Sequence, residues 1–304
     1  MEKKKIIITG GGGFAAGNII YQAMRFEHFE VHAIELRNVP LVQGRLEWHV
    51  LDLQNGEELK NTINRVNPDV IVHTAAVSDI DYCEAHQEIA EKTNVGVTEL
   101  LVSICNETKC RLIYFSSDSV FDGIAGNYTE EDQPKPVNFY ANTKVRSENL
   151  IRENSRNWVI VRPSLIMGFP VKGAGNSFLW RMVKTLRRGE AVAFPRIEVR
   201  SPIDVITLSR AILELADHSY CGILHLSGNN ALSRFDMARS IATRLGYPAE
   251  LIVDKKPSVE TGRAPRPRNV SLSNIRAKKI LETPMLDLDE GIDLIIENMR
   301  DTTL

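Results

Sequence analysis

The stretch Ile8-Thr9-Gly10-Gly11-Gly12-Gly13-Phe14-Ala15-Ala16-Gly17 decides the fold of this chain, because it joins an apolar strand to a helix through four consecutive glycines. Gly10 suits a tight turn, Gly13 lets the backbone approach a pyrophosphate, and the small side chain of Ala16 lets the helix pack closely on the strand. The first amides of such a helix face a bound anion. We predict a dinucleotide-binding turn made by Gly10, Gly13, Phe14, Ala15 and Ala16; a glycine-rich turn that binds nothing is the alternative.

The next predicted strand, Val31–Glu35, ends on a carboxylate about twenty residues after this turn, where it would accept hydrogen bonds from an adenosine ribose. The charge of Glu35 would repel a 2′-phosphate and favours NAD(H), whereas Arg37 could partner that phosphate, so NADP(H) stays open. Asp52 and Leu53 follow a further apolar run and could reach the adenine. A surface carboxylate at a helix start is the alternative for Asp52.

Short apolar runs alternate with helical patterns through the first half of the chain, which is typical of a parallel sheet built from βαβ units. The candidate strands are Lys5–Thr9, Val31–Glu35, Asp69–His73, Arg111–Ser116 and Val159–Arg162. The candidate helices are Ala16–Phe29, Glu57–Val66, Glu84–Thr108 and Asn138–Asn154. We therefore predict an α/β protein with a Rossmann-type, doubly wound parallel sheet.

After Pro163 the pattern changes to loops rich in proline and glycine around the candidate helices Ser177–Arg188, Ser233–Leu245 and Leu288–Met299. We expect a dinucleotide-binding domain over residues 1–165 and a smaller, mainly substrate-binding lobe over residues 166–304. A strand-like run near residues 223–228 would return to the main sheet, so the two parts interleave.

Composition excludes several classes of function. The 304 residues contain 37 Lys and Arg against 39 Asp and Glu, a net charge of −2, so no basic excess favours nucleic acid or an anionic membrane. The four cysteines form no CxxC pair, which predicts reduced thiols in a cytoplasmic protein. The uncharged stretch after the basic N-terminus is interrupted by glycines, so we expect neither a signal peptide nor a membrane span.

Tyr140 and Lys144 stand four residues apart, on one face of a predicted helix. The ammonium group should favour the phenolate and lower the pKa of Tyr140, which makes the phenol a usable acid or base; a chance pair is the alternative. Ser116, Ser117 and Asp118 follow a strand at the edge of the sheet where open α/β sheets bind ligands. A serine hydroxyl there could bond a carbonyl oxygen while Tyr140 delivers a proton, or could merely cap a turn.

The segment His73-Thr74-Ala75-Ala76 follows another candidate strand. The small side chains of Ala75 and Ala76 would let a ribose and a nicotinamide pass close to the backbone. We interpret His73 as a buried histidine satisfied by the backbone. Neither metal-ligand spacing nor a GxSxG motif occurs, so we expect no metal site and no hydrolase chemistry.

With these residues assembled, the chain resembles the extended short-chain dehydrogenase/reductases from Lys5 to about Met299, and most closely their dTDP-4-dehydrorhamnose reductase branch. Residues 9–16 resemble the TGxxGxxG turn, with Ala16 in place of the third glycine. Residues 73–84, 116–123 and 266–272 resemble the segments NAAAYTxVDxAE, STDYVFDG and RPxNSxL. Val77 and Ser119 replace aromatic residues of the branch where a sugar would lie, so the exact substrate stays open.

The resemblance implies an NAD(P)H-dependent reductase of a 4-keto sugar nucleotide, with hydride transfer to C4. It assigns Ser117 to polarise the carbonyl, Tyr140 to donate the proton, and Lys144 to tune Tyr140 and hold the nicotinamide ribose. Asn94 matches a structural asparagine. The expected substrate-binding residues are Val77, Asp118, Asn176, Arg181, Arg200 and Arg263, with the arginines as candidates for clamping a diphosphate. A homodimer is expected.

Two alternatives stay open. One is a sugar-nucleotide epimerase that retains NAD and returns its hydride internally; a dehydratase is weaker, because Asp118 offers only one carboxylate beside the hydroxyl-bearing strand. The other is a non-catalytic, dinucleotide-binding regulatory subunit, as some relatives of the branch are.

Overall fold

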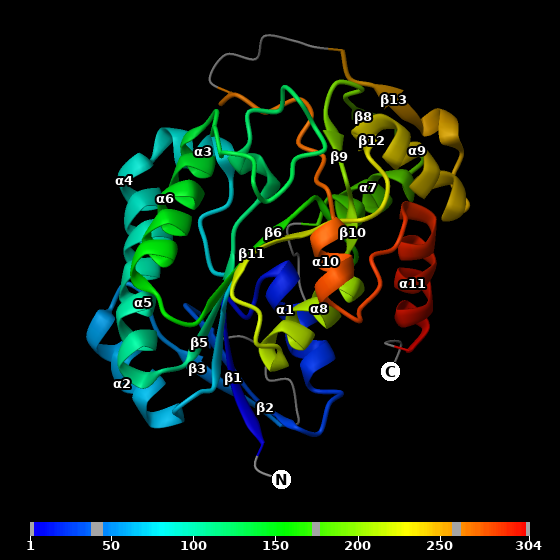
Figure 1. Cartoon of the computed structure of the whole chain (residues 1–304). Coiled ribbons are helices and arrows are strands. Elements are labelled where there is room, and N and C mark those ends of the chain that lie inside the picture. The colour runs from blue at the N-terminus through cyan, green and yellow to red at the C-terminus, as the bar shows by residue number, and fades with distance from the viewer. Residues whose placement is uncertain (1–2, 38–44, 172–176, 257–262, 302–304) are drawn as a thin grey trace.

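The computed structural model describes residues 3–37, 45–171, 177–256 and 263–301. Its central sheet has seven strands in the order β11-β6-β5-β4-β1-β2-β3, and every neighbouring pair is parallel (Figure 1). The strands are β1 (Lys4–Thr9), β2 (Phe29–Glu35), β3 (Leu46–Val50), β4 (Val70–His73), β5 (Arg111–Phe115), β6 (Trp158–Pro163) and β11 (Gly222–Leu226). The strand order reverses between β1 and β4, so ligands are expected at the carboxyl ends of these strands. The predicted Rossmann-type sheet is confirmed.

Helices cover both faces of the sheet, which is why its strands are continuously apolar. On one face lie α1 (Phe14–Ala23) and α8 (Val205–Asp217). On the other lie α2 (Gly56–Val66), α5 (Val97–Thr108) and α6 (Phe139–Asn154).

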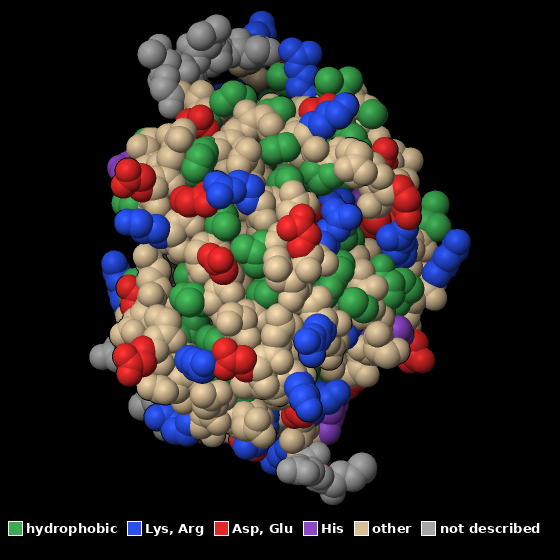
Figure 2. All heavy atoms as spheres, turned by 60° about the vertical axis from the view of Figure 1, so that its left-hand side comes forward, with side chains coloured by type: hydrophobic (Ala, Val, Ile, Leu, Met, Phe, Trp, Pro, Cys, Tyr) green, Lys and Arg blue, Asp and Glu red, His purple; other side chains and the backbone are tan. Residues whose placement is uncertain are grey.

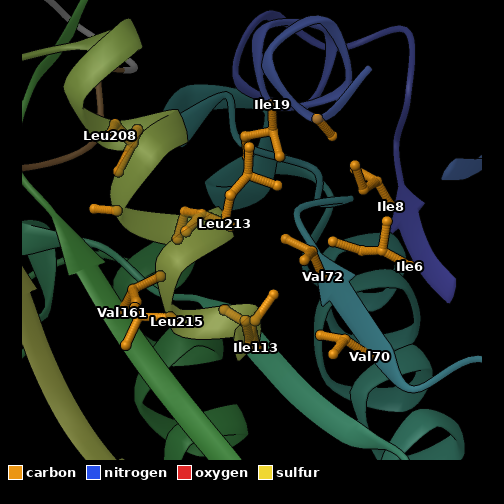
Figure 3. Close-up of a cluster of buried hydrophobic side chains, with 14 of the residues drawn as sticks. Ile6, Ile8, Ile19, Val70, Val72, Ile113, Val161, Leu208, Leu213 and Leu215 are labelled. Carbon is orange, nitrogen blue, oxygen red and sulfur yellow. The ribbon is translucent and has the colours of Figure 1, made fainter. Parts of the chain in front are cut away.

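Side chains alternate along β1, so one strand feeds both hydrophobic layers. Ile6 and Ile8 pack with Ile19 of α1 and Leu208 of α8 in the layer drawn in Figure 3. Ile7 points the opposite way, into the layer under α2 and α5. All three isoleucines of β1 are fully buried, which fixes the strand in the centre of the sheet.

The observed elements differ from the predicted ones in several places. The first helix ends at Ala23 rather than Phe29, because Phe29 is buried as the first residue of β2. Strand β3 and helix α8 were not among the predicted elements. Helix α8 packs against α1 on the main sheet, so part of the chain after residue 165 belongs to the sheet's own layers.

The long helix predicted over Glu84–Thr108 is divided. It consists of α3 (Ile80–Ala85), α4 (Gln87–Ala90), a π-helical turn (Glu91–Gly96) and α5. Such a wide turn commonly marks a functional position, and here it contains Asn94.

The second lobe has its own apolar cluster, built from α7 (Phe178–Leu186), α9 (Arg234–Arg244) and α11 (Leu288–Asp301). Three two-stranded sheets are β7 (Ile166–Met167) with β10 (Ile203–Asp204), β9 (Val199–Arg200) with β12 (Leu232–Ser233), and β8 (Val192–Phe194) with β13 (Ile252–Asp254). The short helices are α10 (Ile275–Ile280) and the 3₁₀ turns Asp118–Val120 and Ala249–Leu251. The run expected to return to the sheet does so as β11, paired with β6, so the lobes interleave.

Figure 2 turns the face formed by α2 to α6 toward the viewer, and acidic and basic side chains are intermixed on it. Among the described helices, none is long and apolar enough to span a bilayer.

Candidate functional site

The glycine-rich turn is shaped to receive an anion. Gly10 has φ of +69°, and a Cβ atom there would lie 3.0 Å from the Cα atom of Ala75, so a side chain would be strained and crowded. Gly13 precedes α1, whose N-terminus has no side-chain cap and no acidic residue in its first turn of Phe14, Ala15 and Ala16. The amides at this helix end are therefore available to a phosphate group, which fits the dinucleotide predicted for the turn.

Residues expected at the adenosine end lie at the carboxyl ends of β2 and β3. The carboxylate of Glu35 accepts the amide of Gly12 at 2.8 Å, so it lies against the glycine-rich turn. Arg37 is exposed two residues further on. Asp52 is exposed and accepts the amide of Gln54, whereas Leu53 packs on the layer under α2.

Three residues expected to act in catalysis come together at the end of β5. Helix α6 begins at its cap Asn138, whose Oδ1 atom accepts the amide of Ala141 at 2.9 Å. Lys144 Nζ lies 5.8 Å from the centre of the Tyr140 ring and donates to the carbonyl of Phe115 at 2.8 Å. The Ser117 hydroxyl lies close enough to the phenol of Tyr140 to lower its pKa.

Burial is the largest cause of the pKa shifts of Tyr140 and Lys144. It raises the pKa of Tyr140, and the negative charge of Asp118 raises it further, whereas the nearby Ser117 hydroxyl lowers it. The lowered pKa expected for Tyr140 from its spacing to Lys144 is therefore absent, because desolvation raises the pKa of the phenol. Burial also lowers the pKa of Lys144 to about 8, although Glu148 opposes the shift. In the protein without ligands, Tyr140 holds its proton at neutral pH and can act as a donor.

A buried ion pair that was not predicted anchors α6. Glu148 follows Lys144 by one turn of α6 and accepts Arg162 Nε at 2.9 Å and Nη2 at 2.6 Å. Ser116 Oγ donates to the same carboxylate. The spacing Tyr140, Lys144, Glu148 on one helix face could have indicated the third residue, but its partner on β6 is visible only in the fold.

Asn94 holds the loop after β4. Its Oδ1 atom accepts the amide of Val77 at 2.8 Å, and its Nδ2 atom donates to the carbonyl of Val77 and to Thr143 Oγ1. This loop brings Ala75 against Gly10 and leaves Ala75, Ala76 and Val77 half-buried. The π-helical turn thus connects the loop to α6.

His73 is buried as predicted, but the prediction that its ring hydrogen-bonds to the backbone is wrong. Its Nδ1 atom pairs with Thr9 Oγ1 at 2.8 Å, and its Nε2 atom has no partner among the described residues. Burial lowers the pKa of His73 to about 3, and the charge of Lys144 adds to this effect.

Asp118 and Arg200 form the buried wall beside Ser117. Arg200 Nε lies 3.7 Å from Asp118 Oδ2, while its Nη atoms donate to the carbonyls of Val199, Pro267 and Arg268. Ser164 Oγ also donates to Asp118. Arg200 therefore joins Asp118, after β5, to the segment that resembles RPxNSxL.

A second arginine, Arg234, lies near Arg200 and was not predicted. The charges of Arg200 and Arg181 add to burial in lowering its pKa, and Glu198 is the acidic residue that opposes them. Its Nε atom is buried with no hydrogen-bond partner in the described part of the chain. Arg181, Arg200 and Arg234 thus concentrate positive charge on the second-lobe side of the site.

Two expected substrate residues, Arg263 and Asn176, are not part of this cluster among the described residues. Arg266 hydrogen-bonds to Asp81 at 2.8 Å and lowers the pKa of that carboxyl, and the exposed Arg263 adds a smaller effect in the same direction. Asn176 lies outside the described residues. Their contacts with a substrate stay predictions.

Comparison with known proteins identifies the family of the chain. The model of the family described as the RmlD substrate binding domain matches residues 4–301. The chain is 29% identical over 277 residues to methionine adenosyltransferase 2 subunit beta of Rattus norvegicus, covering 90% of this chain and 81% of the relative.

Two solved structures are similar throughout. A hypothetical dTDP-4-dehydrorhamnose reductase from Sulfolobus tokodaii is 32% identical, with a TM-score of 0.80 over 94% of this chain and 98% of that one. The dTDP-4-dehydrorhamnose reductase of Bacillus anthracis, solved with NADP, has a TM-score of 0.86 over 97% and 99% of the two chains; its 22% identity shows the shared fold alone. The chain therefore belongs to the RmlD-like branch of the extended short-chain dehydrogenase/reductases, a family of NAD(P)-dependent oxidoreductases.

Proposed function

We propose that the protein is an NAD(P)H-dependent reductase that converts the C4 carbonyl of a sugar nucleotide into an alcohol. The observation that carries this proposal is the meeting of Ser117, Tyr140 and Lys144 at the end of β5, beside a glycine-rich turn with an uncapped helix. A nicotinamide dinucleotide, when bound, supplies the hydride. The carboxylate of Glu35 favours NAD(H), because it would repel a 2′-phosphate.

The chain's own residues supply the proton and its control. The raised pKa of Tyr140 keeps the phenol protonated until a carbonyl oxygen gains negative charge beside it. The Ser117 hydroxyl donates to that oxygen and so stabilises the charge that develops. Lys144, held at the end of β5, provides a positive charge that favours the phenolate left after proton transfer.

The substrate's diphosphate would lie against Arg181, Arg200 and Arg234. Guanidinium groups bind phosphate oxygens in a bidentate manner, and the unpartnered Nε atom of Arg234 is a donor suited to such an anion. Val77 and Ser119 border the sugar, and small side chains there admit a bulkier ring than aromatic residues would.

The test is to follow the absorbance of the reduced nicotinamide while the protein is incubated with NADH or NADPH and a dTDP-4-keto-6-deoxy sugar. We expect oxidation by the wild type and a loss of at least a hundredfold in kcat for Tyr140→Phe, since general acid catalysis contributes about 10²–10⁴-fold. Lys92→Gln, a substitution on the exposed side of the π-helical turn, is the control. Equal rates for wild type and Tyr140→Phe would overturn the assignment of Tyr140.

A second candidate is a dinucleotide-binding regulatory subunit, favoured by the likeness to a beta subunit of methionine adenosyltransferase. A regulatory subunit keeps the cofactor site but needs no proton donor. Tight dinucleotide binding without turnover of any keto-sugar nucleotide, unchanged by Tyr140→Phe, would favour this candidate.

A further inference from the structure

Two histidines and a glutamate meet at the edge of the central sheet, on the face covered by α2. His32 of β2 lies opposite Glu47 of β3 in the strand register, and His49 follows Glu47 by two residues on the same face. His32 Nδ1 and His49 Nε2 are 3.1 Å apart. The Glu47 carboxylate lies 3.7 Å from His32 Nδ1 and 3.9 Å from His49 Nε2.

We propose that His32, Glu47 and His49 form a binding site for one divalent transition metal ion, with Zn²⁺ as the best match. Donor atoms bonded at about 2.0–2.1 Å to a tetrahedral zinc ion lie roughly 3.3–3.4 Å from one another. The three distances at this cluster are close to that spacing, so small side-chain movements complete the geometry. Two imidazoles and a carboxylate are ligands that zinc accepts in other proteins.

A hydrogen bond outside the cluster orients the first ligand. His32 Nε2 lies 3.1 Å from Glu30 Oε1. An ionised carboxylate only accepts, so the proton of this bond is on Nε2 and the lone pair of Nδ1 faces the cluster. A carboxylate behind a metal-binding histidine is the usual arrangement at protein metal sites.

The second histidine can adapt. Without metal, His49 Nε2 donates to His32 Nδ1; metal binding moves that proton to His49 Nδ1, on the side of Arg65. Arg65 Nη2 lies 3.5 Å from Nδ1, at the limit of a hydrogen bond, and its exposed side chain can turn away.

The site is accessible to a metal ion and to water. A groove of about 780 Å³ lies between β3 and α2 and is lined by Glu47, His49 and Arg65 among others. Both histidine side chains are 5% exposed, whereas that of Glu47 is 64% exposed. Two fixed imidazoles and one movable carboxylate therefore leave a fourth position for a water molecule from the groove. The ion would link the side chains of β2 and the edge strand β3, in addition to the backbone hydrogen bonds between these strands.

The test is titration of the full-length, tag-free protein with ZnCl2 in competition with a chromogenic chelator, with inductively coupled plasma analysis of the metal content. We expect one Zn²⁺ per chain. The Glu47→Gln variant should lower the affinity at least tenfold and His49→Gln should abolish binding. His28→Gln, which alters an exposed histidine paired with Asp217, is the matched control and should bind like the wild type.

Because Glu47 is exposed, its variant should keep the wild-type circular dichroism, so a lost affinity reports on ligation. Titration with Co²⁺ identifies the donor atoms: nitrogen and oxygen ligation gives weak visible bands without a thiolate charge-transfer band. The proposal is overturned if Glu47→Gln and His49→Gln both bind Zn²⁺ like the wild type, if no saturable site is found, or if the thiolate band appears, which would assign the ion to cysteines.

Discussion

Removing the charge of Glu148 should destabilise the protein more than any comparable change on the surface of α6. The side chains of Glu148 and Arg162 are 2% and 1% exposed, and three hydrogen bonds reach the carboxylate. In Glu148→Gln the Arg162 guanidinium stays buried, with the His225 ring at 3.4 Å as a neighbour that carries no negative charge. Breaking a buried pair in this way costs about 3–5 kcal/mol.

The assay is urea unfolding at 25 °C, followed by circular dichroism. The control is Glu91→Gln, which removes the partner of Arg146 in a solvent-accessible pair between the π-helical turn and α6; the two side chains are 31% and 53% exposed. Exposed pairs contribute about 0–1 kcal/mol, so the control should unfold nearly as the wild type does.

The double variant Glu148→Leu with Arg162→Met separates charge from packing. Replacing both members of a buried pair by apolar residues is often neutral, so this variant should recover most of the lost stability, less about 1 kcal/mol for the hydroxyl of Ser116. A loss below about 1 kcal/mol in Glu148→Gln, or a double variant less stable than the single one, would refute the reasoning.

Three further predictions concern the cofactor site and pH. Gly10→Ala should weaken NADH binding at least tenfold in a fluorescence titration, because the residue has φ of +69° and its Cβ would press on Ala75; unchanged affinity would contradict the role of the turn. Burial lowers the pKa of His73 and His225 from 6.5 to about 3. Between these pH values only the unfolded chain binds the two protons, so the free energy of unfolding should fall as pH drops from about 6.5 toward 3. A constant urea midpoint from pH 7 to 5 would contradict this prediction. The affinity for NADH should decrease as pH rises through about 8, because Lys144 loses its charge there. This pH dependence should be absent in Lys144→Met. The same pH profile in both proteins would assign the titration to another group.

The fold and the proximity of Tyr140 and Lys144 could be predicted from the sequence, because both depend on local patterns. The run Ile6-Ile7-Ile8 before the glycines predicts a strand covered on both faces, and Tyr140 and Lys144 share a helix face at any position of that helix. Strand β3 was missed because it is a short edge strand in which Glu47 and His49 interrupt the apolar pattern.

Properties that depend on residues far apart in the chain could not be predicted from the sequence. The spacing of Tyr140 and Lys144 predicts a lowered phenol pKa, but the direction of the shift depends on burial under elements far along the chain. The environment of Arg234 depends on Arg200, and that of Arg162 depends on Glu148. Each of these partners lies on another element of the chain. The break of the helix around Asn94 likewise follows from contacts with Val77 and α6 rather than from helix propensity.

The most direct test of the reductase assignment is to follow the hydride itself. The protein is incubated with a dTDP-4-keto-6-deoxy sugar and NADH or NADPH deuterated at nicotinamide C4 on the transferred face, and the products are analysed by mass spectrometry and proton NMR. A reductase places one deuterium at C4 of the sugar and forms one oxidised nicotinamide per product. Bound dinucleotide with no deuterium at C4 and no oxidised cofactor, from both NADH and NADPH, would contradict the assignment and leave the epimerase or the regulatory subunit.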